Sequence, residues 1–234
     1  MKSSTALLLF SRSASAEAAG KIILFSPKRN KKAIAGLIDN ATQLAADSGL
    51  SWYVSNELSQ TGNSFGGKLT RAIEDIFEKG HSKIIVLGND CPSLTQPLLR
   101  KAIVELEHND WVLGPTPKGG AYLIGITAAS FNAAVFEKIS WQTDIVFQQL
   151  TEYISSSGDN YSCFSMLNDV NNEADILTVS KKALSNNSII RFLINLFTAG
   201  LFEYQLTPSP LICISQVSAN SRRGPPINNN ILLL

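Results

Sequence analysis

The stretch that decides the fold is KIIVLGNDCPSL, residues 83–94. Its apolar residues 84–87 form a short continuous run, which is typical of a strand buried on both faces of a sheet. Gly88 ends the run, Asp90 follows at its carboxyl end, and a helix is predicted to begin near Thr95, a residue type that caps helices. In open α/β sheets ligands collect at the carboxyl ends of strands, so Asp90 stands where a bound group is expected.

Two interpretations of Asp90 follow from its position. A carboxylate at a strand end can hold a divalent metal, and that metal can hold a diphosphate. Alternatively, Asp90 only caps a turn or a helix, because Asp and Asn favour such turns. The local pattern leaves both interpretations open.

Strand-like and helix-like segments alternate through most of the chain. Strands are predicted at 5–10, 51–55, 83–87, 111–114, 121–127 and 161–167, and helices at 33–46, 69–79, about 95–106, 143–154 and 173–180. Segment 11–32 is predicted to be irregular, with a short apolar run at 21–25. This alternation predicts an α/β fold with a mostly parallel sheet covered on both faces.

Composition excludes several classes of protein. The 234 residues are 44% hydrophobic, which is enough for a packed core, and a net charge of +1 argues against a nucleic-acid partner. The three cysteines have neither a zinc spacing nor a disulfide pattern, so a reduced cytoplasmic protein is the simplest expectation. The apolar run at 6–10 is too short for a secretory signal, and Arg191 and Asn195 interrupt the longest apolar stretch, so no transmembrane segment is expected.

The last fifty residues differ from the rest. We predict one domain at 1–183, and a C-terminal region at 184–234 made of a helix near 191–201 and an irregular tail rich in Pro, Asn and Ser. This region contains no residue pattern that indicates catalysis or ligand binding. Three interpretations of it stay open: packing on the domain, formation of a homo-oligomer, and partial disorder.

Three further loops fall at predicted element ends. Segment 60–69 is rich in glycine and precedes a helix whose free N–H groups suit an anion, although an ordinary tight connection explains it as well. Segment 114–120 is either a specialised loop or a plain hairpin between strands. Asp169 lies at the end of a late strand and is a candidate second metal ligand; helix capping by Asn171 or Asn172 is the alternative interpretation of that loop.

Taken in order, these loops resemble one bacterial family. The motifs are QTGNSFGGKL (60–69), GNDCPSL (88–94), GPTPKGGAYLIG (114–125), SWQT (140–143) and NDVNNEADI (168–176). They resemble the TagA-like group, also called selenodomain-associated transferase 1, over roughly residues 5–180. The resemblance implies a three-layer α/β/α Rossmann-like sandwich of the nucleotide-diphospho-sugar transferase (GT-A) type. It also implies a nucleotide-diphospho-sugar or nucleoside triphosphate ligand held through Mg²⁺ or Mn²⁺.

The resemblance carries roles onto matching residues of this chain. Asp90 matches the family's metal-binding acid, and Asp169 matches the first acid of its late motif. The implied nucleotide- or substrate-binding residues are Gln60, Gly62, Gly66, Asn89, Gly119, Gly120, Tyr122 and Trp141.

Two departures from the family pattern concern charge. Most relatives carry an acid where this chain has Lys118, and many carry a basic segment after the first strand where this chain has FSRSASAEAAG (10–20). An ammonium group cannot ligate a cation, so Lys118 is expected to face the same cleft as Asp90 and contact a phosphate or the acceptor. An ordinary solvated loop lysine is the alternative.

The sequence therefore supports two kinds of function. The first is a metal-dependent glycosyl or nucleotidyl transferase, with Asp90 and Lys118 as catalytic residues, Asp90 and Asp169 as metal ligands, and an unknown acceptor. The second is a non-catalytic nucleotide-binding or regulatory module with a degenerate active site. The two differ in whether bound nucleotide is turned over.

Overall fold

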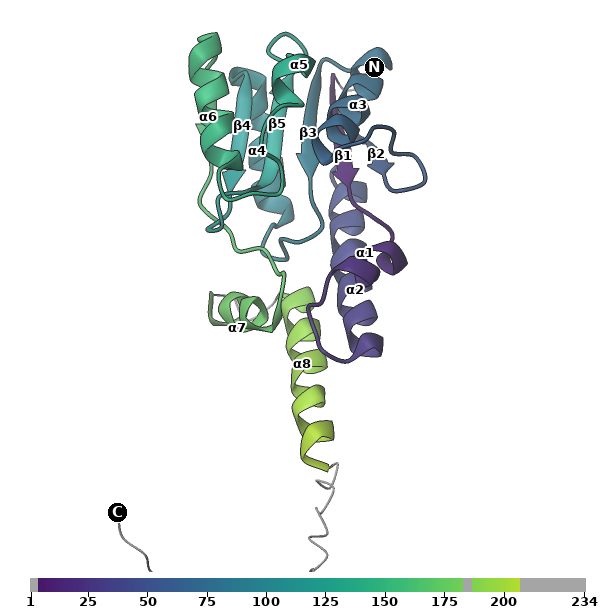
Figure 1. The fold of residues 1–234 in the computed structure, drawn as a ribbon. Helices are drawn as coiled ribbons and strands as arrows, with labels where there is room; N and C mark the ends of the chain where they lie inside the picture. The colour runs from purple at the N-terminus through teal and green to yellow at the C-terminus, as the bar shows by residue number, and fades with distance from the viewer. Residues whose placement is uncertain (1–3, 183–186, 207–234) are drawn as a thin grey trace, which may run out of the picture.

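The computed structural model describes residues 4–182 and 187–206, and in this part of the chain helices cover both faces of one six-stranded sheet (Figure 1). The strands are β1 (Thr5–Phe10), β2 (Ser51–Ser55), β3 (Lys83–Leu87), β4 (Trp111–Pro115), β5 (Ala121–Thr127) and β6 (Tyr161–Cys163), in the order β2-β1-β3-β5-β4-β6. Strand β1 is parallel to β2 and β3, and β4 is parallel to β6, whereas β5 is antiparallel to both its neighbours. The predicted α/β class and mostly parallel sheet are confirmed.

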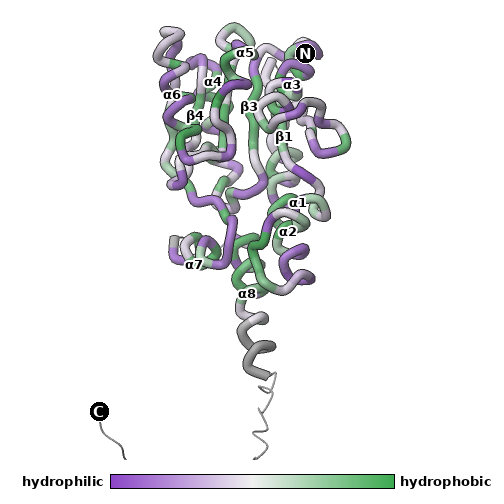
Figure 2. Tube along the Cα trace, viewed as in Figure 1, coloured by the Kyte–Doolittle hydropathy of each residue, from purple (hydrophilic) through white to green (hydrophobic). Residues whose placement is uncertain are grey.

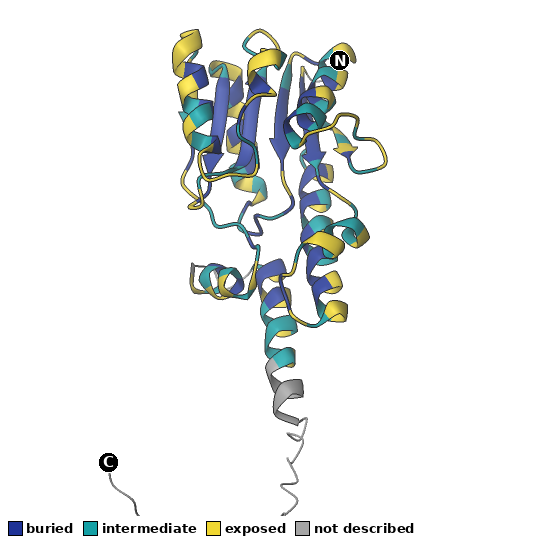
Figure 3. Ribbon diagram, viewed as in Figure 1, coloured by how far each residue is buried: buried dark blue, intermediate teal, exposed yellow. Residues whose placement is uncertain are grey.

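The side-chain alternation of the strands divides the core into two layers. Along β1, Ala6 and Leu8 pack into one cluster, and Leu7 and Leu9 pack into the other. Because successive side chains of a strand point to opposite faces, a continuous apolar run is what a sheet covered on both sides requires. Figure 2 shows the hydrophobic character of β1 and β3 in the middle of the molecule, and Figure 3 shows that the strands are largely buried.

Helices form the two outer layers. They are α1 (Ala14–Gly20), α2 (Pro27–Ala46), α3 (Phe65–Glu78), α4 (Gln96–His108), α5 (Ala133–Phe136), α6 (Val146–Ser157), α7 (Glu173–Lys182) and α8 (Ser188–Leu206). Residues of α3, α5 and α6 fill one cluster, and residues of α2 and α4 fill the other. None of the described helices is both long and apolar enough to cross a membrane.

A third apolar cluster lies beyond the sheet and joins distant parts of the sequence. Helices α2, α7 and α8 pack together through residues that include Ile34, Ile176 and Ile190. The predicted boundary at 183/184 therefore separates helices that pack on one another in space. The predicted tail beyond residue 206 lies outside the described residues.

The structure corrects the prediction that segment 11–32 is irregular. Helix α1 occupies 14–20, and α2 begins at Pro27 instead of residue 33. No residue of α1 is buried and the first turns of α2 are strongly charged, so the apolar periodicity that predicts helices is missing there. Ser13 caps α1 by accepting a hydrogen bond from the Ala16 amide at 3.3 Å.

Smaller differences concern element ends. Strand β6 stops at Cys163, although the sequence predicted a strand to residue 167, and α6 begins at Val146, although a start at 143 was expected. The predicted helix start near Thr95 is confirmed, because Thr95 is the residue immediately before α4.

Candidate functional site

The carboxyl ends of the parallel strands open into a cleft of about 730 Å³. Leu9 of β1 is in register with Leu87 of β3, so the loops that follow these strands meet at the same edge of the sheet. The lining includes Arg12, Glu17 and Lys21 from the segment after β1, Glu57, Gln60 and Lys68 from the segment after β2, Asn89, Asp90 and Cys91 after β3, Tyr122 of β5, and Asp169. A second hollow of about 490 Å³ shares Asp90 and Tyr122 with this cleft and extends to Lys118 and Trp141.

The fold brings the two predicted metal ligands together. Asp90 and Asp169 both line the cleft, and the Val170 amide donates to the Asp90 carbonyl oxygen at 2.8 Å, which joins the two loops. One carboxylate oxygen of Asp169 accepts from the Asn171 side-chain amide at 2.7 Å. The other, Oδ1, is buried and accepts no hydrogen bond from any described residue. A buried acceptor without a donor is costly, so Asp169 is poised to accept one from a ligand.

The Asp90 carboxylate is already paired with a base. Lys21 Nζ lies 2.6 Å from Asp90 Oδ1, and the side chains of Lys21 and Asp90 are 14% and 35% exposed. Sequence reasoning missed Lys21 because it follows a helix that had not been predicted. The Asp90 side chain therefore acts as an ion-pair partner of Lys21 in this structure, and not as a turn cap.

This ion pair bears directly on the expected metal. Two unit charges 4 Å apart interact by about 4 kcal/mol at the effective dielectric typical of a protein surface, so the Lys21 ammonium would strongly oppose a divalent cation on Asp90. Within residues 4–182 and 187–206, no group of three or more His, Cys, Asp and Glu side chains could hold a metal ion. As arranged here, the side chains do not fit a divalent cation at Asp90 unless the ammonium leaves.

Two glutamates shape the electrostatics of the same cleft. Burial and, next, the charge of Asp90 raise the pKa of Glu17, which is half-buried. Glu57 accepts hydrogen bonds from both the hydroxyl and the backbone amide of Ser13, and these bonds lower its pKa. Glu57 thus holds the start of α1 against the loop that follows β2.

Cys91 also lines the cleft, but its environment does not activate it. Burial raises the pKa of its thiol to about 12, and the charges of Asp169 and Asp90 act in the same direction. Since the thiolate is the nucleophilic form of cysteine, Cys91 is not a nucleophile near neutral pH.

Asn89 is a polar side chain that the cleft leaves unsatisfied. The residue is 9% exposed, lines the cleft, and its Nδ2 has no hydrogen-bond partner in the described part of the chain. A buried amide donor calls for an acceptor, which a bound ligand can supply. Its predicted role in substrate binding is compatible with this geometry.

The remaining predicted residues divide between the two hollows and the scaffold. Gln60, Gly120 and Tyr122 line the cleft with Asp90, and Trp141 lines the second hollow. The Tyr122 hydroxyl donates to the Ser165 carbonyl at 3.1 Å, and burial raises the pKa of Tyr122. Its hydroxyl therefore serves the structure in this arrangement.

Gly62, Gly66 and Gly119 line neither hollow. A Cβ on Gly66 would overlap the Glu137 carbonyl oxygen and press on the indole of Trp141, so glycine at this position leaves the space in which these two groups pack. Gly119 has φ +76° in the turn between β4 and β5, and a Cβ there would overlap the Asp144 carbonyl. Segment 114–120 joins β4 and β5 as an antiparallel hairpin with a register shift between Gly114 and Pro115, and its residues Lys118 and Gly120 also line the hollows.

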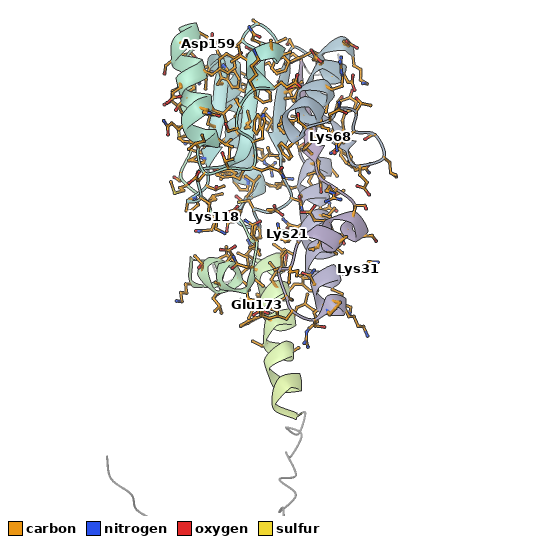
Figure 4. The ribbon with its side chains drawn as sticks, viewed as in Figure 1. Lys21, Lys31, Lys68, Lys118, Asp159 and Glu173 are labelled. Carbon is orange, nitrogen blue, oxygen red and sulfur yellow. The ribbon has the colours of Figure 1, made fainter. Side chains whose placement is uncertain are left out.

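Lys118 forms an ion pair with an acidic side chain of the protein itself. It lines the second hollow, and its Nζ lies 2.7 Å from Asp175 Oδ2 at the start of α7. Lys21 and Lys118 both lie between the sheet and the α7–α8 pair (Figure 4). Asn172 caps α7 by accepting a hydrogen bond from the Asp175 amide at 3.0 Å, so the capping interpretation is confirmed for Asn172.

Comparison with solved structures defines the class of fold. The chain is similar to a protein from Desulfovibrio desulfuricans G20 described as a "putative nucleotide-diphospho-sugar transferase", with a TM-score of 0.71, 20% identity, and coverage of 86% of this chain and 98% of that chain. The fold is thus of the nucleotide-diphospho-sugar transferase kind. The chain belongs to the family described as "Uncharacterized protein conserved in bacteria (DUF2064)", whose model matches residues 16–143.

More distant structures are similar only in outline. Rv0371C of Mycobacterium tuberculosis, solved in complex with manganese, gives a TM-score of 0.44 at 12% identity, over 76% of this chain and 99% of that chain. A cytidylyltransferase from Leptospira borgpetersenii gives 0.41 at 14% identity, over 89% and 99%. No curated protein matches the chain. The narrower TagA-like resemblance stays a prediction.

Proposed function

We propose that this protein is a transferase that binds the diphosphate part of a nucleoside triphosphate or a nucleotide-diphospho-sugar and transfers a nucleotidyl or glycosyl group. The observation that carries the proposal is the meeting of Arg12 and Lys21 with Asp90 and Asp169 in one cleft at the carboxyl ends of β1 and β3. The fold shared with the Desulfovibrio protein supports the same class of ligand.

The size and chemistry of the cleft suit such a ligand. Its volume of about 730 Å³ lies within the range of roughly 300–1,000 Å³ that is usual for small-molecule sites. Lysine and arginine side chains bind phosphate oxygens through charge-assisted hydrogen bonds. The buried donor of Asn89 and the buried acceptor of Asp169 would pair with a phosphate oxygen and a sugar hydroxyl of the ligand.

A divalent cation is part of the function expected from the sequence. Asp90 and Asp169 are the side chains that would hold Mg²⁺ or Mn²⁺, which commonly uses one or two carboxylates and completes its shell with phosphate oxygens and water. Such a cation would neutralise charge on the leaving diphosphate. Because Lys21 occupies Asp90, the arrangement described here gives no support to that part of the expectation.

A second candidate function is nucleotide binding without turnover. The ion pair between Lys21 and Asp90 favours it, because the acid that relatives are expected to use for a metal is engaged by the protein's own base. In this alternative, the cleft binds the same ligands and the bound nucleotide remains intact.

The two functions are separated by measuring binding and turnover on the same sample. Thermal unfolding with a panel of nucleoside triphosphates and nucleotide sugars, in EDTA and in Mn²⁺, detects binding because a ligand of the native state raises the melting temperature. Release of diphosphate would mark nucleotidyl transfer, and release of nucleoside diphosphate would mark glycosyl transfer. Binding with neither product supports the alternative, and the absence of stabilisation by every compound would contradict both.

A further inference from the structure

One contact in the cleft has no role in the proposed function: Lys21 is paired with Asp90, the acid that the sequence predicted to hold a metal. We infer that Lys21 is the cation of this site, so that its ammonium group binds the ligand's phosphates and ligand binding needs no divalent metal. This inference rests on the proposed function, because it names the group that recognises the diphosphate.

The backbone around Lys21 is fixed by specific hydrogen bonds. The Lys21 amide donates to the Glu17 carbonyl oxygen at 2.9 Å, and the Lys21 carbonyl accepts from Asn30 Nδ2 at 2.8 Å. Asn30 is itself buried and accepts from the amides of Ile23 and Leu24. Lys21 is therefore tied to α1 on one side and to α2 on the other, and its Cα is held at the cleft.

The side chain of Lys21 is directed into the cleft and is mostly buried. It lines the cleft together with Asp90, and only 14% of it is exposed. A buried ammonium needs a charge partner, and Asp90 supplies one at 2.6 Å. An ammonium group has three donors, so a lysine held by one carboxylate retains donors for phosphate oxygens.

A second observation independently points to an anion. Asn89, the residue before Asp90, places a buried and unpartnered Nδ2 donor at the same cleft. An amide nitrogen donates hydrogen bonds and does not ligate a metal, so this group requires an acceptor such as a phosphate oxygen. Arg12 lines the cleft as a further base. Three residues with donor groups therefore line one cleft, and none of these groups can ligate a metal.

The experiment compares metal dependence in the wild type and in two Lys21 variants of the full chain. The probe is inorganic diphosphate, titrated by calorimetry in EDTA and again in Mn²⁺. Lys21→Met removes the charge, and Lys21→Arg keeps it. Lys31→Met is the matched control, because Lys31 is exposed on α2 and does not line the cleft.

The expected result is that wild type binds diphosphate in EDTA and that Mn²⁺ changes the affinity by less than about threefold. Lys21→Met should weaken binding about 10- to 100-fold, the loss expected for one hydrogen bond to a charged group, whereas Lys21→Arg and Lys31→Met should bind nearly as wild type. Lys21→Met should also gain affinity for Mn²⁺ alone, because Asp90 is then free.

Two different results would overturn the inference while leaving the proposed function standing. In the first, wild type binds diphosphate only with Mn²⁺, a measurement that needs no variant to fold. In the second, Lys21→Met binds diphosphate as well as wild type in EDTA. If neither diphosphate nor any nucleotide binds to any of these proteins under either condition, the proposed function fails, and the inference fails with it.

Discussion

Lys118 donates a hydrogen bond to Asp175 across 2.7 Å and thereby joins the turn between β4 and β5 to the first turn of α7. Asp175 Oδ2 also accepts from the Asn171 amide at 2.8 Å, and Asn171 in turn donates to Asp169. This contact between two residues that are 57 positions apart thus supports the loop that carries Asp169, one of the acids of the cleft. Lys118 therefore contacts an acid of α7 in this structure and supports the loop that carries Asp169.

This relationship predicts a small loss of stability in Lys118→Ala. The Lys118 side chain is 48% exposed, and exposed ion pairs contribute about 0.2–1 kcal/mol. A double-mutant cycle with Asp175→Asn, followed by urea unfolding, measures the coupling between the two side chains. A coupling of zero would mean that the pair does not stabilise the loop.

Lys118→Asp tests whether Lys118 also contacts the ligand. It places a carboxylate beside Asp175, and because the two like charges repel, it should destabilise the protein more than Lys118→Ala does. If Lys118 contacts a phosphate or the acceptor as the sequence predicted, Lys118→Asp should bind nucleotide more weakly than Lys118→Ala does. Calorimetry measures both affinities. Unchanged binding in both variants would assign Lys118 a structural role alone.

Asp90→Ala is expected to keep the fold and to remove any increase in nucleotide affinity that Mn²⁺ gives the wild type. The substitution removes the candidate metal ligand and also leaves the Lys21 ammonium without its ion-pair partner. Because Asp90 is about one-third exposed, we expect a loss of about 1–3 kcal/mol in the free energy of unfolding.

The measurements are circular dichroism for the fold, urea unfolding for stability and calorimetry for nucleotide with and without Mn²⁺. Asp144→Ala is the control, because Asp144 is an exposed acid of the neighbouring hollow that does not line the main cleft. If Mn²⁺ strengthens nucleotide binding by wild type and strengthens binding by Asp90→Ala equally, Asp90 is not a metal ligand.

Gly119→Ala is expected to be strongly destabilising. Its φ of +76° costs about 1–2 kcal/mol for a residue with a Cβ, and the overlap of that Cβ with the Asp144 carbonyl adds to this cost. Gly158→Ala is a matched control, since Gly158 has φ +75° but no atom within 4 Å of the added Cβ. In chemical denaturation, equal losses for the two variants would contradict the close packing at Gly119.

Glu57→Gln should make stability less dependent on pH. Hydrogen bonds from Ser13 lower the folded-state pKa of Glu57 below that of the unfolded chain. A depressed carboxyl pKa gives stability that is present above the unfolded value of about 4.5 and is lost as pH falls through the folded value. Urea midpoints from pH 7 to pH 3 should therefore show wild type more stable at neutral pH and converging with the variant in acid.

The sequence alone determined the class of fold and where most strands of the sheet lie in the chain, whereas the order of the strands and the antiparallel direction of β5 came from the structure. Buried runs such as 84–87 carry their own signal, because a strand covered on both faces must be apolar at every position. The glycine and proline loops between them marked most of the element ends, and the order of those loops indicated the class of fold. The sequence also singled out Asp90, which follows β3, and Asp169, which lies in the loop after β6 and not at the end of a strand, and the fold places both acids in one cleft.

Only the tertiary structure decided which charges meet. Lys21 follows a short helix without buried residues, so no periodicity marks that helix in the sequence. Its pairing with Asp90 joins residues far apart along the chain, as does the pairing of Lys118 with Asp175. Local patterns report whether a residue is buried and in what element it lies, whereas the partner of a charged side chain depends on which loops the packed sheet brings to the same edge.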